Sequence, residues 1–305
     1  MDKSDICVIR AKLKDDYVWN AIKKYGFDIY IPYKDRNLML RLMREVWFRL
    51  RLPRKDIWYN KKLKHLNVTT ILVYDPLITP ELLSWLQKRY TNVRIILSYE
   101  NRADTTINPN IIGDFIEKWS YDTDDCNKYG MKFLPPAFYD SYAFDSTDFE
   151  KKYDVLYLGR DKGRLGKLLR IEDSLKSRGL TTHFHVCADR SFFMFKNFHY
   201  KKVISYQKYM ELVKNSNAIL NITRKGQTSI TQRELEAVFF NVKCITTNPK
   251  IKEFELYDET RYFLLEENYD IDELAMFLKM PISKLDEEAK NAYKYEVVLS
   301  NMLNC

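Results

Sequence analysis

The sequence predicts an α/β protein with two domains, each containing a parallel sheet flanked by helices. Its 305 residues are about twice the usual length of one domain. Short apolar runs alternate with helical patterns along the chain, and alternating strands and helices favour parallel sheets with right-handed crossovers. A loop-like stretch, Ala143–Phe149, separates two such series. We expect two Rossmann-like domains that face a central cleft, at residues 1–148 and 149–285, followed by a C-terminal helix at 286–305 that packs back on the first domain.

Strands of the first domain are predicted where short apolar runs occur. Helical spacing of the apolar residues predicts helices between them, and in Pro80–Tyr90 the side chains of Leu82, Leu83 and Leu86 fall on one side. The predicted strands are Ile6–Ile9, Ile29–Pro32, Thr70–Tyr74, Val93–Ser98 and Lys132–Leu134, and further helices are Tyr17–Tyr25 and Leu38–Leu50.

The second domain repeats this alternation. Tyr153–Leu158 is continuously apolar, as is typical of a strand buried on both faces of a parallel sheet. The other predicted strands are His183–Cys187, Ala218–Ile222 and Lys243–Thr246, and the predicted helices begin near Arg164, Gln207, Gln232 and Asp272.

A basic, glycine-rich turn follows the first strand of the second domain. Glycine is scarce in this chain, yet three of its eight glycines fall within eight positions. A strand, a flexible turn and a helix N-terminus together offer backbone N–H groups and mobile cations to a phosphate. The residues of this predicted anion site are Gly159, Arg160, Lys162, Gly163, Arg164, Gly166 and Lys167.

Other loops of the second domain are expected at the same edge of the sheet. In open parallel sheets, ligands bind beyond the carboxyl ends of the strands. Ser205–Tyr206 follows the apolar pair Val203–Ile204, and Thr223–Thr231 and Thr247–Pro249 follow two predicted strands. Together these cations, hydroxyls and one aromatic ring suit a diphosphate, a ribose and a base.

Two glutamates open the helix after the loop Thr223–Thr231. Thr231 and Glu234 have the spacing of a capping box, which gives Glu234 a structural role. Glu236 is neither the partner of that box nor part of the apolar stripe. A carboxylate near a helix N-terminus at this edge is suited to accept the hydroxyls of a ribose.

Several of these stretches together resemble the donor domain of GT-B nucleotide-sugar glycosyltransferases. The closer likeness is to bacterial enzymes that build capsule, O-antigen or protein-linked glycans, such as galactofuranosyl- and glucosyltransferases. Trp119–Gly130 and Phe133–Pro136 also resemble the end of that family's first domain. The stretches that carry the resemblance in the second domain are Tyr157–Gly163, Ser205–Tyr209, Gly226–Ala237 and Cys244–Asn248.

The resemblance implies the GT-B fold and the transfer of a sugar, UDP-linked, to a hydroxyl of a glycan or lipid-linked glycan in cell-surface polysaccharide synthesis. It implies no metal and no other cofactor, because lysine and arginine stabilise the departing diphosphate. Thr228 stands where the family often has an acidic residue, and Asn241 replaces a usual glycine, which leaves the donor sugar open. The implied donor-binding residues are Gly159, Arg160, Lys162, Arg164, Tyr206, Thr228, Arg233 and Glu236.

An inverting transferase also needs a general base on the acceptor side. The ends of the first-domain strands offer three candidates, Asp75, Glu100 and Asp104. Asp75 has the alternative role of capping a loop before Pro76, and Glu100 that of pairing with Arg102. A retaining enzyme requires no such base.

Two patterns are typical of metal sites and have structural alternatives. Asp122-Thr-Asp124 has the form of the metal-binding DxD of another glycosyltransferase class, whereas Asp122 with Asp125 fits the start of a helix. His183, His185 and Cys187 alternate on one strand and offer zinc ligands, but alternate strand residues fan out poorly around one ion. We favour the structural interpretation of both.

The apolar runs and the cysteines of the chain indicate where in the cell the protein is expected. No apolar run approaches the roughly 20 residues that cross a bilayer, and the charged start has no signal-peptide core, so we expect a cytoplasmic protein. Five scattered cysteines without a CxxC pair argue against a disulfide framework.

One segment, Arg36–Lys64, carries ten basic residues against two acidic ones. Its helix Leu38–Leu50 is amphipathic and contains Trp47, which is typical of helices at anionic membrane surfaces; the alternative is a helix whose apolar stripe packs on its own domain.

Two alternative functions of the protein stay open. One is a noncatalytic nucleotide-sugar sensor, and the other is a nucleic-acid binder that works through the basic segment. No nucleic-acid-binding motif accompanies this segment, so we expect no nucleic-acid partner.

Overall fold

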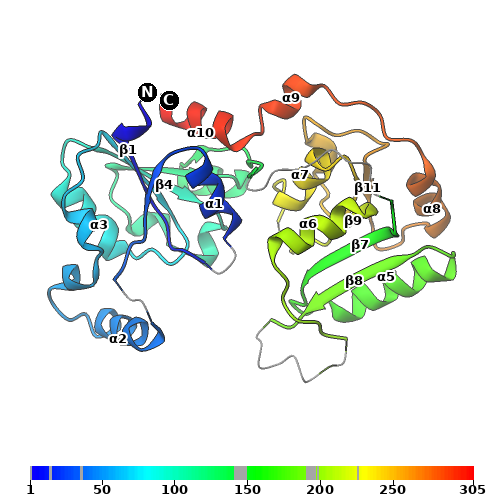
Figure 1. Ribbon diagram of the computed structural model, residues 1–305, viewed down its shortest axis with the longest axis horizontal. Coiled ribbons are helices and arrows are strands. Elements are labelled where there is room, and N and C mark those ends of the chain that lie inside the picture. Colours follow the sequence, from blue (N-terminus) through cyan, green and yellow to red (C-terminus); the bar gives the residue numbers. More distant parts are fainter. Residues whose placement is uncertain are drawn as a thin grey trace. The chain divides into compact units, whose positions relative to one another are not determined.

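The computed structural model describes residues 2–13, 16–34, 37–140, 150–189, 197, 199–224 and 227–305 (Figure 1). The chain forms two compact units, Met1–Pro135 and Pro136–Cys305, and each is described by itself. Four features of the sequence analysis lie outside the described residues: Arg36, the loop 143–149, the expected boundary at 148–149, and Gly226.

The first unit has a six-stranded, fully parallel sheet in the order β2-β1-β3-β4-β5-β6. The chain moves outward from β1 to β2 and then returns to the other side of β1 with β3, so the direction of strand order reverses between β1 and β3. The strands are β1 (Ile6–Ile9), β2 (Asp28–Tyr30), β3 (Thr70–Tyr74), β4 (Arg94–Tyr99), β5 (Ile116–Ser120) and β6 (Lys132–Phe133). The α-helices are α1 (Tyr17–Lys24), α2 (Leu38–Arg49), α3 (Pro80–Arg89) and α4 (Thr123–Tyr129).

The five strands predicted for this unit are present, and β5 is one that the sequence analysis missed. The charged residues Glu117 and Lys118 interrupt the apolar pattern by which the other strands were predicted. In the structure, Glu117 is paired across the sheet with Arg94 of β4 at 2.6 Å and with Lys132 of β6 at 3.1 Å, so its charge is compensated within the sheet. The core on one face joins β1, β3 and β4 to the apolar side of α3, formed by Leu82, Leu83 and Leu86 as predicted.

The second unit has a five-stranded parallel sheet in the order β11-β10-β9-β7-β8, and its strand order reverses between β7 and β9. The strands are β7 (Tyr153–Arg160), β8 (Thr182–Cys187), β9 (Ser216–Asn221), β10 (Lys243–Thr246) and β11 (Tyr262–Leu264). The α-helices are α5 (Leu165–Ser177), α6 (Tyr206–Lys214), α7 (Gln232–Phe239), α8 (Ile271–Lys279), α9 (Glu287–Asn291) and α10 (Tyr295–Asn304). In both units, short 3-10 helices lie at Lys3–Asp5, Lys55–Trp58, Lys61–Lys64, Ala103–Thr105, Pro109–Ile111 and Ile251–Glu253.

Helices cover both faces of the second sheet (Figure 1). Leu156 of β7 packs with α6 and α7 on one face, whereas Val155 and Tyr157 pack with α5 and α8 on the other. All three side chains are buried, which confirms the prediction of a strand buried on both faces. The apolar pair Val203–Ile204, which precedes Ser205–Tyr206, belongs to no strand; Val203 is 70% exposed, and Ser205 caps α6.

The C-terminal segment is tied to the start of the second unit. The backbone of Phe138 donates a hydrogen bond to the carbonyl of Tyr293 at 2.7 Å and accepts one from Tyr295 at 3.0 Å. The Phe138 ring stacks on Phe239 of α7 with a centroid distance of 4.0 Å. No helix in the described part of the chain is both long enough and apolar enough to cross a bilayer.

Candidate functional site

The two neighbouring strands at the reversal point of the second sheet are joined at their carboxyl ends by Arg164. Its guanidinium donates hydrogen bonds to the carbonyl of Ile222, just beyond β9, and to that of Arg160 at 3.1 Å, at the end of β7. Such a reversal point is where ligands bind in open parallel sheets. Arg164 thus holds together the two loops that border this position.

The basic turn after β7 has a defined backbone shape. Lys162 and Gly163 both have positive φ, 49° and 75°, and at the second of these positions glycine relieves the strain. The N–H of Lys162 donates to Asp189, after β8, at 3.0 Å. Asp161 accepts a hydrogen bond of 2.6 Å from the backbone N–H of Leu165, the first residue of α5. The turn is therefore fixed at both ends.

Cations converge on the Lys162 side chain. Burial and the positive charges of Arg224, Arg164 and Arg233 together lower the pKa of its amino group to about 8, against an opposing effect of Asp189. Because like charges repel, gathering them here costs free energy unless an anion lies among them. This cluster gives the predicted donor site an excess of positive charge beside Lys162.

Gly159 and Arg160, the last two residues of β7, have structural contacts next to this turn. The guanidinium of Arg160 donates to the carbonyls of Ala188 and Asp189 at 3.0 and 2.6 Å. A Cβ at Gly159 would lie 2.9 Å from the hydroxyl of Tyr157, so only glycine fits without movement. The contacts of Arg160 place its charge beside the loop after β8.

Glu236 is deeply buried in the middle of α7, with 3% of its surface exposed. Its two carboxylate oxygens accept hydrogen bonds from Tyr206 at 2.8 Å and from Tyr209 at 2.7 Å, both on α6. Burial raises the pKa of Glu236, while these two hydroxyls and Arg233 oppose the rise. Arg233 also donates to the carbonyl of Leu158 in β7.

The second glutamate of α7 organises the neighbouring loops. Glu234 forms the predicted capping box with Thr231 and also accepts a hydrogen bond of 2.6 Å from Thr246 at the end of β10. Asn248 approaches the same carboxylate at 3.5 Å. Thr228 is half-buried in this loop, just after Lys225 and Gly226, which the structure does not describe. The predicted capping box of Glu234 is confirmed.

The first unit has a second polar cluster at its own reversal point, between the ends of β1 and β3. Asp75 follows β3, is 1% exposed, and accepts a hydrogen bond of 2.7 Å from the backbone of Glu100. Arg10, directly after β1, contacts the carboxylates of Glu100 at 3.0 Å and Asp16 at 3.4 Å. Burial raises the pKa of Asp75 to about 6 and that of Glu100 to about 7.

Of the three candidate bases, Asp75 and Glu100 therefore lie together, whereas Asp104 lies outside this cluster. The carboxylate of Asp104 is about half exposed and pairs with Arg102 at 3.3 Å. The ion pair that Glu100 forms is with Arg10, and that of Arg102 is with Asp104. A carboxylate with a pKa near 7 and a neighbouring arginine is suited to proton transfer.

Three members of these clusters were not predicted from the sequence. Arg10 and Asp16 flank the loop after the first strand, and their position beyond a strand's carboxyl end was a usable signal. Tyr209 appeared only within a matched stretch, and its hydrogen bond to Glu236 depends on α6 and α7 packing side by side. No local pattern in the sequence predicts the hydrogen bond between Tyr209 and Glu236.

The patterns typical of metal sites have structural contacts. Asp122 caps α4 by accepting a hydrogen bond of 3.1 Å from the backbone of Asp125, which confirms the capping interpretation. A ring nitrogen of His185 lies 2.7 Å from the carbonyl of Lys202. Within the described residues, no three His, Cys, Asp or Glu side chains are grouped so that they could hold a metal ion.

Comparison with known proteins shows the fold. No protein-family model matches the sequence, and no curated protein is similar to it. The structure is similar to AviGT4, a glycosyltransferase of avilamycin A biosynthesis, at 11% identity and a TM-score of 0.61, covering 98% of this chain and 96% of that one.

Two further solved structures are similar over the whole chain. Anabaena HepE, solved with UDP and glucose, matches at 10% identity and a TM-score of 0.56, with 98% of each chain covered. A putative UDP-N-acetylglucosamine 2-epimerase from Listeria monocytogenes matches at 9% identity and 0.50, covering 98% of this chain and 94% of that one. With two parallel-sheet Rossmann-like domains and these neighbours, the protein has the GT-B fold.

Proposed function

We propose that this protein is a glycosyltransferase that uses a nucleoside-diphosphate sugar, UDP-linked, and needs no metal. The observation that carries the proposal is the group of cations around Lys162 at the reversal point of the second sheet. The diphosphate occupies this position, where Lys162 and Arg224 neutralise its charge and the first turn of α5 faces it. HepE, which has the same fold, was solved with UDP and glucose, and this supports the choice of nucleotide.

The ribose binds near Glu236 in this proposal. Each carboxylate oxygen accepts one tyrosine hydrogen bond, and a carboxylate has about four acceptor positions in all. Tyr206 is half-buried and Tyr209 is buried, so Tyr206 is the partner that a ribose hydroxyl displaces. Tyr209 keeps the carboxylate in place during this exchange.

The chemical step is the attack of an acceptor hydroxyl on the anomeric carbon of the donor. A bond forms between the acceptor oxygen and that carbon, and the bond from the carbon to the diphosphate oxygen breaks. The hydroxyl proton passes to Glu100, which is suited to this role by its pKa of about 7 and by its neighbours Arg10 and Asp75. This assignment makes the enzyme an inverting one.

The acceptor is a glycan or a lipid-linked glycan, and the reaction belongs to cytoplasmic steps of cell-surface polysaccharide synthesis. This part of the proposal is supported by the resemblance of residues 157–163 and 226–237 to capsule and O-antigen enzymes. The departures at Thr228 and Asn241 leave the donor sugar to experiment.

The decisive experiment is calorimetric titration of the protein with UDP in the presence of a metal chelator. We expect binding by the wild type and at least tenfold weaker binding by Lys162→Gln. Lys279→Gln removes the same charge from the far end of α8, which runs back from the carboxyl edge of the sheet, and is expected to leave binding unchanged. Equal affinity of wild type and Lys162→Gln contradicts the donor site.

A panel of nucleotide sugars then separates an enzyme from a sensor. Turnover or slow hydrolysis of one donor, lost in Glu100→Gln with UDP affinity retained, supports the transferase. Tight binding without turnover of any donor, unaffected by Glu100→Gln, supports a noncatalytic nucleotide-sugar sensor instead.

A further inference from the structure

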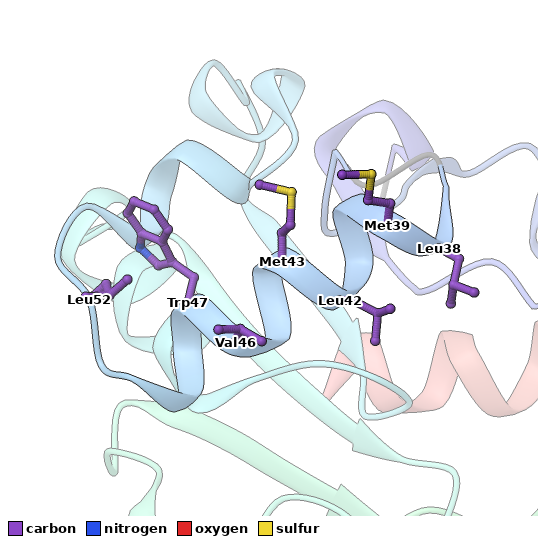
Figure 2. A pocket seen from close by; sticks show the side chains of 7 residues that line it. All are labelled: Leu38, Met39, Leu42, Met43, Val46, Trp47 and Leu52. Atoms are coloured by element: carbon purple, nitrogen blue, oxygen red, sulfur yellow. The ribbon is translucent and has the colours of Figure 1, made fainter.

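Helix α2 of the first unit presents its apolar residues outward (Figure 2). The sequence left open whether this stripe packs on its own domain, and the structure shows that most of it does not. Seven residues line a shallow apolar groove along the helix and its following turn: Leu38, Met39, Leu42, Met43, Val46, Trp47 and Leu52. Leu38 and Met39 are each 71% exposed, Val46 is 55% exposed, and Leu42 is 52% exposed.

The inner side of α2 is held by a charged residue and aromatic rings. Arg44 is only 6% exposed, and its guanidinium lies 3.8 Å from the centroid of the Tyr33 ring. Phe48 packs on the core of the unit. The indole N–H of Trp47, which lines the groove, donates to the carbonyl of Pro53 after the helix at 3.0 Å. The helix is thus anchored with its apolar side facing away, so the exposed groove is a property of the folded unit.

The surroundings of the groove are strongly basic. Residues 37–64 contain nine lysines and arginines and only two acidic residues. Three of the cations have carboxylate partners: Arg41 with Glu45, Lys55 with Glu81 and Lys64 with Asp56. Five other cations in this stretch are exposed: Arg49, Arg51, Arg54, Lys61 and Lys62.

We propose that α2 docks on an anionic lipid bilayer, with its apolar groove inserted among the headgroups and the surrounding cations on lipid phosphates. A contiguous apolar patch marks an interaction surface, and a flanking excess of positive charge selects an anionic one. Nucleic acid fits less well, because the exposed leucine, methionine and valine side chains offer no donor to a phosphate. The proposal does not depend on the transfer reaction, and its test measures binding alone.

The test is co-sedimentation of the full chain with vesicles of zwitterionic lipid alone or with one third anionic lipid. We expect the wild type to bind anionic vesicles at least tenfold more tightly than neutral ones. Leu42→Gln/Val46→Gln removes apolar contact and Arg49→Gln/Arg51→Gln removes charge, and each is expected to weaken binding about tenfold or more.

Matched variants control for general surface changes. Phe115→Gln alters an apolar residue that is 86% exposed elsewhere in the same unit, and Lys252→Gln/Lys279→Gln removes two exposed charges from the other unit. Both are expected to sediment like the wild type. Trp47 adds a local signal, since its fluorescence is expected to shift to the blue with anionic vesicles, and the shift is expected to be absent in Trp47→Phe.

Two results would overturn the proposal. The first is no sedimentation of wild type with anionic vesicles, and the second is equal loss of binding in the controls. If the first result is accompanied by a concentration-dependent dimer in analytical ultracentrifugation that Leu42→Gln/Val46→Gln abolishes, the groove is assigned to a second copy of the chain. Circular dichroism and thermal melting of each variant ensure that a loss of binding is not a loss of fold.

Discussion

The hydroxyl of Tyr209 donates a hydrogen bond of 2.7 Å to Oε2 of Glu236, joining α6 to α7 inside the second unit. Tyr206, one turn earlier, donates to the other oxygen at 2.8 Å. One carboxylate therefore fixes the relative position of two helices whose N-termini border the candidate donor site. The two tyrosines differ in burial, and this difference leads to a prediction.

Tyr209→Phe is expected to lower the free energy of unfolding by about 1–3 kcal/mol, because the buried Glu236 loses a partner that water cannot replace. Tyr206→Phe is expected to cost less than about 1 kcal/mol, since its half-buried hydroxyl has access to solvent. Urea unfolding of both variants measures the difference. Equal losses would show that both contacts are equally buried in solution.

UDP binding is expected to be linked to proton uptake through Lys162. Its pKa of about 8 in the free protein means that part of the amino groups are neutral at pH 8–9. A bound diphosphate favours the charged form and raises this pKa, so binding takes up as much as one proton in this range and weakens as pH rises above 8. Well below pH 7 the group is already protonated and no uptake is expected from it.

Calorimetry in buffers of different ionisation enthalpy measures this uptake at pH 8.5. Lys162→Gln is expected to abolish it, and Lys279→Gln to retain it. Uptake of the same size in Lys162→Gln would assign the proton to another group.

Arg44 is expected to anchor α2. Arg44→Ala removes the guanidinium from the Tyr33 ring and leaves a gap, so we expect unfolding to become easier by about 1–3 kcal/mol. Arg41→Ala on the same helix breaks only an exposed pair with Glu45, for which about 0.5 kcal/mol or less is expected. Chemical denaturation of the two variants provides the comparison, and equal effects would mean that Arg44 contributes no more than a surface residue.

The positions of most strands were predicted from the sequence because these strands are short, mainly apolar runs. Ile6–Ile9, Thr70–Tyr74 and Lys243–Thr246 were predicted with the bounds that the structure has. Strand β5 was not predicted, because its charged residues argue against a buried strand. In the folded sheet these charges are compensated by ion pairs with the neighbouring strands. Such pairing is a property of the assembled sheet and leaves no periodic signal.

The candidate sites were predictable as far as loop positions determine them. Because the loops after parallel strands share one edge, residues such as Lys162 and Glu100 were found from the chain alone. Their partners were not: Arg10 meets Glu100 across a distance of 90 positions, and Tyr209 meets Glu236 only through helix packing. The outward face of α2 was likewise unpredictable, because amphipathic spacing does not say which side of a helix its domain covers.

Glu100 is expected to control the pH dependence of transfer. As a general base it works when deprotonated, so kcat/KM, which reports the free enzyme, is expected to rise with pH through about 7 and then to level off. Glu100→Gln is expected to lower kcat by about 10²- to 10⁴-fold while UDP affinity stays unchanged. Asp104→Asn, which alters an exposed carboxylate outside the cluster, is expected to behave like the wild type.

A second measurement of Glu100 needs no substrate. Burial raises its pKa above the unfolded value, so its contribution to stability is fully present below about pH 4.5 and is lost as pH rises to about 7. Asp75 acts in the same direction up to about pH 6. The wild type is therefore expected to lose thermal stability between pH 5 and 7, and Glu100→Gln to lose less. If both the kinetic and the thermal profiles of Glu100→Gln match those of the wild type, Glu100 is not the titrating group and the base must be sought elsewhere.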